Sequence, residues 1–128
     1  MSKMNRRAAV QYLHERHPHV IDPPFGEVDR EALQLETLWF QAHTCDLMDE
    51  LAELAVRRCF ATIHHLLVHG DPDVQIAVPQ HFVMPHLIFH DNLTWAQARM
   101  PDVLAGLVDR IRSSILRRAL GPRDFDDS

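Results

Sequence analysis

The chain has 128 residues, of which 46% are hydrophobic and 24% are charged, and its net charge is −5. This length supports one domain with its own core, and the composition is that of a globular protein rather than a disordered or disulfide-rich one. No apolar stretch is long enough to span a membrane, and the basic N-terminus leads into no apolar segment of a secretory signal, so we expect one domain over residues 1–128 in the cytoplasm, without membrane contact.

Apolar residues recur at spacings of three and four along the chain, and strand-like alternation is nearly absent, which predicts an all-α fold. The first helix is predicted over residues 4–16, since the residue before Pro18 avoids the helical region. A proline-rich connector follows over residues 18–28. The second helix is predicted over residues 30–42, with Asp29 as its N-cap. Its apolar positions are Ala32, Leu35, Leu38, Trp39 and Ala42.

The third predicted helix begins after Thr44 as N-cap and runs to His69, with Gly70 as the left-handed residue that ends it. The stripe of this helix that we expect to be buried consists of Leu47, Leu51, Leu54, Ala55, Cys59, Ile63, Leu66 and Leu67. Asp71 and Pro72 then start a further helix. Prolines at positions 79 and 85 interrupt it, because each removes a hydrogen bond and clashes with the preceding turn.

The C-terminal third of the chain contains two more predicted helices. A short one begins at Thr94, which forms a capping box with Gln97. The last one follows Met100–Pro101 and runs to Leu120, and residues 122–128 form a frayed acidic tail. Short connections between helices favour antiparallel neighbours. We therefore predict a single-domain irregular helical bundle of five or six helices.

Negative charge is concentrated in residues 22–53, which hold nine acidic residues and one basic residue. Four of the acids follow the spacing i, i+3, i+4, i+7, which places them on one face of the third predicted helix. They are Asp46, Asp49, Glu50 and Glu53. Such a stripe is either a tolerated solvated face or a docking surface that speeds association with a cationic partner. Because the same charge repels phosphate, we expect no binding of nucleic acid.

Aromatic residues offer a second type of contact with a partner. Trp39, Phe40 and Trp95 lie in apolar patterns and are predicted to belong to the core. Phe25 lies in the proline-rich connector and is a better candidate for an exposed anchor. Trp39 is the alternative anchor.

Ten histidines make a metal site a hypothesis to weigh. His65 and His69 are spaced i, i+4, as are His86 and His90, and on helices each pair would lie within reach of one ion. The alternative is that all four are half-exposed residues near helix ends. No Glu-x-x-His motif of a bundle metal centre and no His-Glu-x-x-His motif is present. We therefore predict no metal and no other cofactor.

The two cysteines, Cys45 and Cys59, lack the Cys-x-x-Cys spacing of redox and zinc sites. In a reducing compartment we expect two small buried thiols. No phosphate-binding glycine loop or nucleophile motif is present either. We therefore predict no catalytic residue.

The stretch Ile63 to Leu87, IHHLLVHGDPDVQIAVPQHFVMPHL, resembles a pattern of small all-helical bacterial proteins. In that pattern a helix ends in Leu-Leu-x-x-Gly-Asp, an acidic residue and valine follow, and Trp-x-x-x-Arg-Met comes later. Trp95, Arg99 and Met100 match that last motif. The proteins resemble immunity-type members of bacterial polymorphic or contact-dependent toxin systems. The resemblance covers residues 45–105, departs at three positions (Pro79, Met84, Pro85) and brings no catalytic residues.

The resemblance implies a non-enzymatic protein that neutralises a cognate toxin domain by binding it. The acidic residues 46, 49, 50 and 53 independently fit a basic, nuclease-like partner, with residue 25 or 39 as anchor. Two alternatives stay open. One is a metal-binding helical bundle that uses the four histidines, and the other is a homodimeric scaffold module. The apolar residues that would form the interface of this homodimer are Phe82, Val83, Leu87, Ile88 and Phe89.

Overall fold

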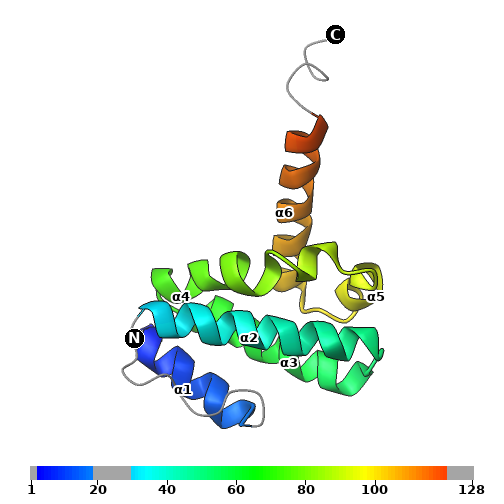
Figure 1. Ribbon diagram of the computed structural model, residues 1–128. Coiled ribbons are helices and arrows are strands. Elements are labelled where there is room, and N and C mark those ends of the chain that lie inside the picture. The colour runs from blue at the N-terminus through cyan, green and yellow to red at the C-terminus, as the bar shows by residue number, and fades with distance from the viewer. Residues whose placement is uncertain (1–2, 19–29, 121–128) are drawn as a thin grey trace.

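The computed structural model describes residues 3–18 and 30–120, and in these ranges the chain forms an all-α bundle, as predicted. The helices are α1 (Arg6–Arg16), α2 (Arg30–Asp49), α3 (Glu53–His69), α4 (Pro72–Ala77), α5 (Leu93–Gln97) and α6 (Asp102–Leu120), with a π-helical turn η1 (Val78–Val83) and a 3-10 turn η2 (Leu87–Phe89). The helices α1 to α4 and η1 pack side by side, whereas α6 projects away from them (Figure 1). Phe25, nearly all of the connector at 18–28 and the tail at 122–128 lie outside the described residues.

The N-terminal segment is fixed to the link between α3 and α4. The Asn5 side chain accepts a hydrogen bond from the Ala8 amide and caps α1, so this helix begins two residues later than predicted. Met4 donates to the His69 carbonyl at 2.8 Å and accepts from the Asp71 amide at 2.8 Å. Gly70 lies between these two bonds in an extended conformation, with φ −72°, and our prediction of a left-handed residue is wrong. A glycine fits here because a Cβ atom would lie 2.4 Å from the Leu66 carbonyl oxygen.

The largest departure from the predicted helices is that α2 continues to Asp49 without a break near residue 43. Thr44 is no N-cap, because it is buried within α2 and its hydroxyl donates to the Phe40 carbonyl at 2.8 Å. The helix ends in a Schellman motif, in which the Ala52 amide donates to the Leu47 carbonyl at 3.0 Å. Leu51 takes the left-handed position of this motif, with φ 53°, where glycine is usual.

The buried face of α2 is unusually polar. Glu36, Thr37, Gln41 and Thr44 are all at most 1% exposed. Each side chain has a partner: one oxygen of the Glu36 carboxylate, for example, lies 3.0 Å from His14 Nε2 on α1, although its second oxygen has no hydrogen-bond partner among the described residues. Because these residues face inward, the apolar residues that we predicted to be buried face outward. Leu35 and Trp39 are both 43% exposed, so the prediction that Trp39 belongs to the core is wrong, whereas Phe40 is buried.

Gln41 holds the interrupted segment after α4 against α2. Its Nε2 atom donates to the carbonyls of His81 at 3.1 Å and Met84 at 2.5 Å, and its Oε1 atom accepts from the His86 amide at 3.1 Å. The prolines break the helix here as predicted, since α4 gives way to η1 at Val78. This segment is central to the core, and four of the five residues of the predicted homodimer interface are buried in it. Only Phe89, at 64% exposure, reaches the surface, so that interface is wrong.

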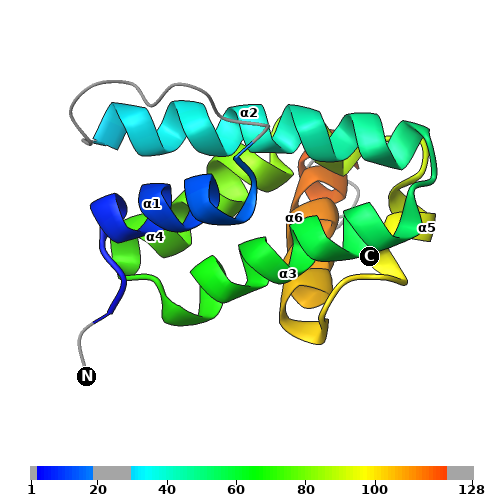
Figure 2. The ribbon, with the colours of Figure 1, turned by 90° about the horizontal axis from the view of Figure 1, so that it is seen from below.

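The C-terminal part of the structure combines a short helix with a long one. The short helix α5 starts at Leu93 and has no side-chain cap, so the predicted capping box at Thr94 is wrong. The long helix α6 follows Pro101 as predicted and buries Leu104 and Val108 near its start. Its outer half projects from the bundle (Figure 1), so that the view from below looks nearly along its axis, past α2 and α3 (Figure 2). Within residues 3–18 and 30–120, no helix has the combination of length and apolar character that a membrane crossing requires.

Candidate functional site

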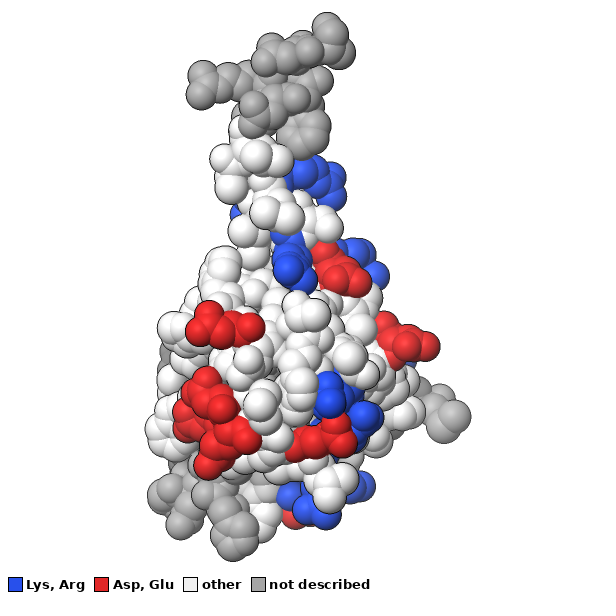
Figure 3. Space-filling view, turned by 90° about the vertical axis from the view of Figure 1, so that its right-hand side faces the viewer, with Lys and Arg blue, Asp and Glu red and all other residues white. Residues whose placement is uncertain are grey.

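The four predicted acidic residues lie together on the surface, but they do not share one helix. Asp46 and Asp49 belong to the last turn of α2, Glu50 lies in the turn, and Glu53 begins α3. All four are exposed, and we call them the acidic corner. Figure 3 views the end of the molecule at which α2 turns into α3, and acidic side chains gather on this face. The predicted stripe on a single helix is therefore wrong, whereas the surface cluster exists.

Two of the four carboxylates already have cationic or hydrogen-bonding partners in the chain. Glu53 lies 2.6 Å from the Nε atom of Arg99, whose guanidinium also stacks on the Trp95 ring at 4.1 Å. Asp49 lies 2.8 Å from His90 Nε2. The side chains of Asp49 and Glu53 remain 67% and 47% exposed. Asp46 and Glu50 form no ion pair with any described residue, so they carry the unneutralised charge of the acidic corner.

His90 fixes the geometry of this corner. Its Nδ1 atom accepts a hydrogen bond from the Asn92 amide at 2.9 Å, so in the neutral ring Nε2 carries the hydrogen. Nε2 then donates to Asp49 at 2.8 Å and to the Cys45 carbonyl at 3.2 Å. The Asn92 side chain donates to the Met48 carbonyl at 2.9 Å. Side chains from a distant segment thus satisfy the carbonyls at the end of α2, where no basic residue is present.

Apolar side chains are exposed beside the acidic residues. Leu35, Trp39, Ala42, Asp46 and Asp49 follow spacings of four and three, and all are exposed, so they form one outer face of α2. Trp39 and Asp46 are two helical turns apart, about 10 Å along the axis. Beyond the helix end, Leu51 is 51% exposed and Leu54 is 72% exposed. Our prediction placed both leucines in the core.

The sequence contains a signal for this outer face that we did not use. Trp39 and Asp46 are seven residues apart, which is two turns of a continuous helix. The assumed break near residue 43 separated them into two helices. Phe25, the other predicted anchor, lies outside the described residues.

The histidine pairs do not meet in one site. His65 stacks on the Tyr12 ring with centroids 4.4 Å apart, and its other neighbour is His69 at 4.5 Å. His90 is bound to Asp49 at the acidic corner, and the segment between His86 and His90 is a 3-10 turn rather than an α-helix. Among the described residues, no group of three or more histidine, cysteine or acidic side chains has the geometry to hold a metal ion. The alternative in which the four histidines share one ion is therefore wrong for the described residues.

Both cysteine side chains are held in the thiol form. Burial, together with the nearby carboxylates of Asp49 and Asp46, raises the pKa of Cys45 to about 11. Burial also raises the pKa of Cys59 to about 11, although a hydrogen bond with Thr44 acts in the opposite direction. Since the thiolate is the nucleophilic form, neither side chain is activated at neutral pH.

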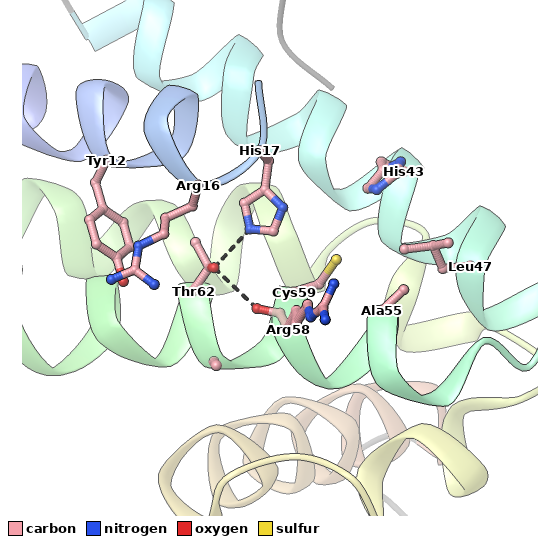
Figure 4. A pocket seen from close by; sticks show the side chains of 10 residues that line it. Tyr12, Arg16, His17, His43, Leu47, Ala55, Arg58, Cys59 and Thr62 are labelled. Atoms are coloured by element: carbon pink, nitrogen blue, oxygen red, sulfur yellow. Dashed lines mark hydrogen bonds between the residues drawn. The ribbon is translucent and has the colours of Figure 1, made fainter. Parts of the chain in front are cut away.

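A cavity with a volume of about 310 Å³ opens between α1, α2 and α3 (Figure 4). It is lined by residues 12 and 16 of α1 with the C-cap residue 17, by residues 43 and 47 of α2, and by residues 55, 58, 59, 61 and 62 of α3. Sequence analysis did not predict this cavity, because its lining residues become neighbours only after three separate helices have packed.

Comparison of the chain with protein-family models, with curated proteins and with solved structures finds no match.

Proposed function

We propose that the chain is a non-enzymatic binding protein that docks onto a basic protein surface through its acidic corner and the outer face of α2. The observation that carries this proposal is the orientation of α2. This helix buries polar residues such as Gln41 and exposes apolar ones such as Trp39, next to the carboxylates at its end. A tryptophan beside unneutralised acids is complementary to a partner surface with an apolar centre and basic surroundings.

Two local features of the acidic corner reduce the stability of the isolated chain, and a role in binding explains why such destabilising residues are present. Asp46 and Asp49 lie at the negative end of the α2 dipole, where an acidic residue is unfavourable by about 0.3–1 kcal/mol. Leu51 holds a left-handed conformation that costs a residue with a side chain about 1 kcal/mol or more. Strained residues of this type concentrate at ligand-binding sites.

The partner that this proposal names is a cognate toxin domain of the nuclease type. The resemblance to immunity-type proteins suggests this partner class, and the charge of the corner agrees with it. A nuclease needs a basic surface to hold phosphates. Occupation of that surface by Asp46 and Glu50 would exclude the nucleic acid and neutralise the enzyme.

The test first identifies a candidate toxin domain, sought as the variable C-terminal domain of a long secreted protein encoded next to this chain, and then measures its affinity for the chain by isothermal titration calorimetry. Glu50→Lys and Asp46→Lys should each weaken binding by about tenfold or more, and Trp39→Ala by about thirtyfold. Asp102→Lys makes the same charge change on α6 and serves as the control, with an expected effect of less than about threefold. Equal losses for Glu50→Lys and Asp102→Lys, or no binding by the wild-type chain, would refute the proposal.

A second copy of the chain is the alternative occupant of the corner, because the projecting half of α6 is basic. It carries Arg110, Arg112, Arg117 and Arg118, together with Leu116 and Leu120, each of which is 57% exposed. Light scattering separates the two cases. A dimer that Glu50→Lys dissociates would assign the corner to self-association, whereas a monomer at all concentrations leaves it to the toxin domain.

A further inference from the structure

The cavity between α1, α2 and α3 has the dimensions of a small-molecule site. Its volume of about 310 Å³ is within the range of ligand pockets, which starts at about 300 Å³. Tyr12, Leu47 and Ala55 contribute apolar or aromatic surface to its walls, and Cys59 contributes an uncharged thiol. Figure 4 shows side chains from all three helices around this space, with the Arg16 guanidinium beside Tyr12 on one side of Thr62 and the Arg58 guanidinium beside Cys59 on the other.

The cavity is positively charged in a protein whose net charge is negative. Arg16 and Arg58 both line it, and none of its lining residues is a carboxylate. Neither arginine forms an ion pair with a described residue. The guanidinium of Arg16 lies over the Tyr12 ring, 5.0 Å from the centroid, which holds it beside the opening. Two unneutralised guanidinium groups around one cavity create a local field that attracts an anion.

The inner wall offers a hydrogen-bond acceptor. The Thr62 hydroxyl donates to the Arg58 carbonyl at 3.1 Å, so toward His17 Nε2, at 2.8 Å, it acts as acceptor. Nε2 of His17 therefore carries the hydrogen, and Nδ1 keeps a lone pair. Figure 4 shows this second ring nitrogen on the side away from Thr62, toward Cys59 and His43.

The surroundings of His17 keep this acceptor in place at neutral pH. Burial, together with the nearby His43 and Arg16, lowers the pKa of His17 to about 4. The ring therefore stays neutral near pH 7 and can accept a hydrogen bond at Nδ1.

We propose that this cavity binds a small carboxylate that has an apolar body and a hydroxyl group. The guanidinium group of Arg58 binds the carboxylate, since the planar fork of arginine matches its two oxygens, and the charge of Arg16 on the other side of Thr62 adds to the attraction. The apolar body packs against Leu47 and Ala55. The hydroxyl donates to Nδ1 of His17. This site is separate from the acidic corner and does not depend on the proposed toxin partner.

The test is a titration of the full-length, isotope-labelled chain with 4-hydroxybenzoate, followed by two-dimensional NMR. Binding with a dissociation constant of about 1 mM or below is expected for a probe of this size, with shifts confined to amides of residues that line the cavity. The uncharged 4-hydroxybenzamide and benzoate, which lacks the hydroxyl, should each bind about tenfold more weakly.

Variants of the arginines test whether these side chains are responsible for binding of the carboxylate. Arg58→Gln should weaken binding of 4-hydroxybenzoate by about tenfold, and Arg16→Gln, which removes only a more distant charge, by about threefold. Arg117→Gln makes the same charge change on the outer half of α6 and should leave binding within about twofold. The inference is overturned if 4-hydroxybenzoate causes no local shifts, if the amide binds as tightly as the acid, or if Arg117→Gln weakens binding as much as Arg58→Gln. Glu50→Lys should leave this titration unchanged, which separates its outcome from that of the toxin experiment.

Discussion

Replacement of Gln41 by leucine is expected to be among the most destabilising polar substitutions in this chain. The side chain is fully buried and makes hydrogen bonds to three main-chain groups, the carbonyls of His81 and Met84 and the amide of His86. Leucine has a similar volume but leaves all three groups without this partner. A buried main-chain group that loses its partner costs about 1–3 kcal/mol, so we expect Gln41→Leu to lower the free energy of unfolding by about 3–5 kcal/mol.

The assay is urea unfolding followed by far-ultraviolet circular dichroism. Gln80→Leu is the matched control, because Gln80 is exposed and belongs to the same segment. It should change the free energy of unfolding by less than about 0.5 kcal/mol. If Gln41→Leu destabilises the chain by less than about 1 kcal/mol, the segment after α4 does not depend on these hydrogen bonds and the argument is refuted.

Three further predictions concern single positions. Leu51→Gly relieves the strain of the left-handed conformation, so it should leave the free energy of unfolding unchanged or raise it by up to about 1 kcal/mol. The same variant should weaken toxin binding. Clear destabilisation in urea would contradict this prediction. Gly70→Ala places a Cβ 2.4 Å from the Leu66 carbonyl oxygen and from Val74, so we expect a loss of about 2 kcal/mol or more in the same assay, and a neutral effect would contradict the close approach. The lowered pKa of His17, about 4 against an ordinary value of 6.5, means that between these pH values the unfolded chain binds a proton that the folded chain does not. Stability should therefore fall as the pH decreases from 6.5 to 4, by about 1–2 kcal/mol for this half-exposed ring, and a His17→Gln variant that loses as much stability over this range as wild type would contradict the assignment.

The fold class was predictable because its signals are local. Spacings of three and four between apolar residues predicted helices, and Asp71 with Pro72 predicted the start of α4. The structure confirms both, and the Asp71 side chain accepts a hydrogen bond from the Val74 amide. Pro79 and Pro85 likewise predicted where regular α-helix would fail.

The course of α2 was not predictable by the same rules, for two physical reasons. The helix ends at a leucine in a left-handed conformation, whereas the rule expects glycine or asparagine at that position. Its buried face is polar, because Glu36 meets His14, Gln41 meets the main chain, and the threonines bond to carbonyls of their own helix. A prediction based on apolar residues therefore assigned the wrong face to the core.

The candidate sites also combine features that local sequence patterns reveal with features that depend on tertiary contacts. The four acids were identified from the sequence, and their exposure agrees with a surface role, but their pairing with His90 and Arg99 depends on tertiary contacts. Arg16, His17 and Arg58 carry no motif, and only the packing of three helices brings them around one cavity. Local patterns can predict a charged surface, whereas a cavity between helices requires the fold.

The central claim is that the acidic corner recruits a basic partner by electrostatic attraction, and the association rate tests it most directly. We would measure this rate by stopped-flow fluorescence with the candidate toxin domain identified for the affinity test, at several ionic strengths. The account expects the wild-type rate to fall by about tenfold or more between low and high salt, and Glu50→Lys to remove most of this dependence while Asp102→Lys preserves it. A wild-type rate that does not change with salt, or an equal response of both variants, would contradict the account.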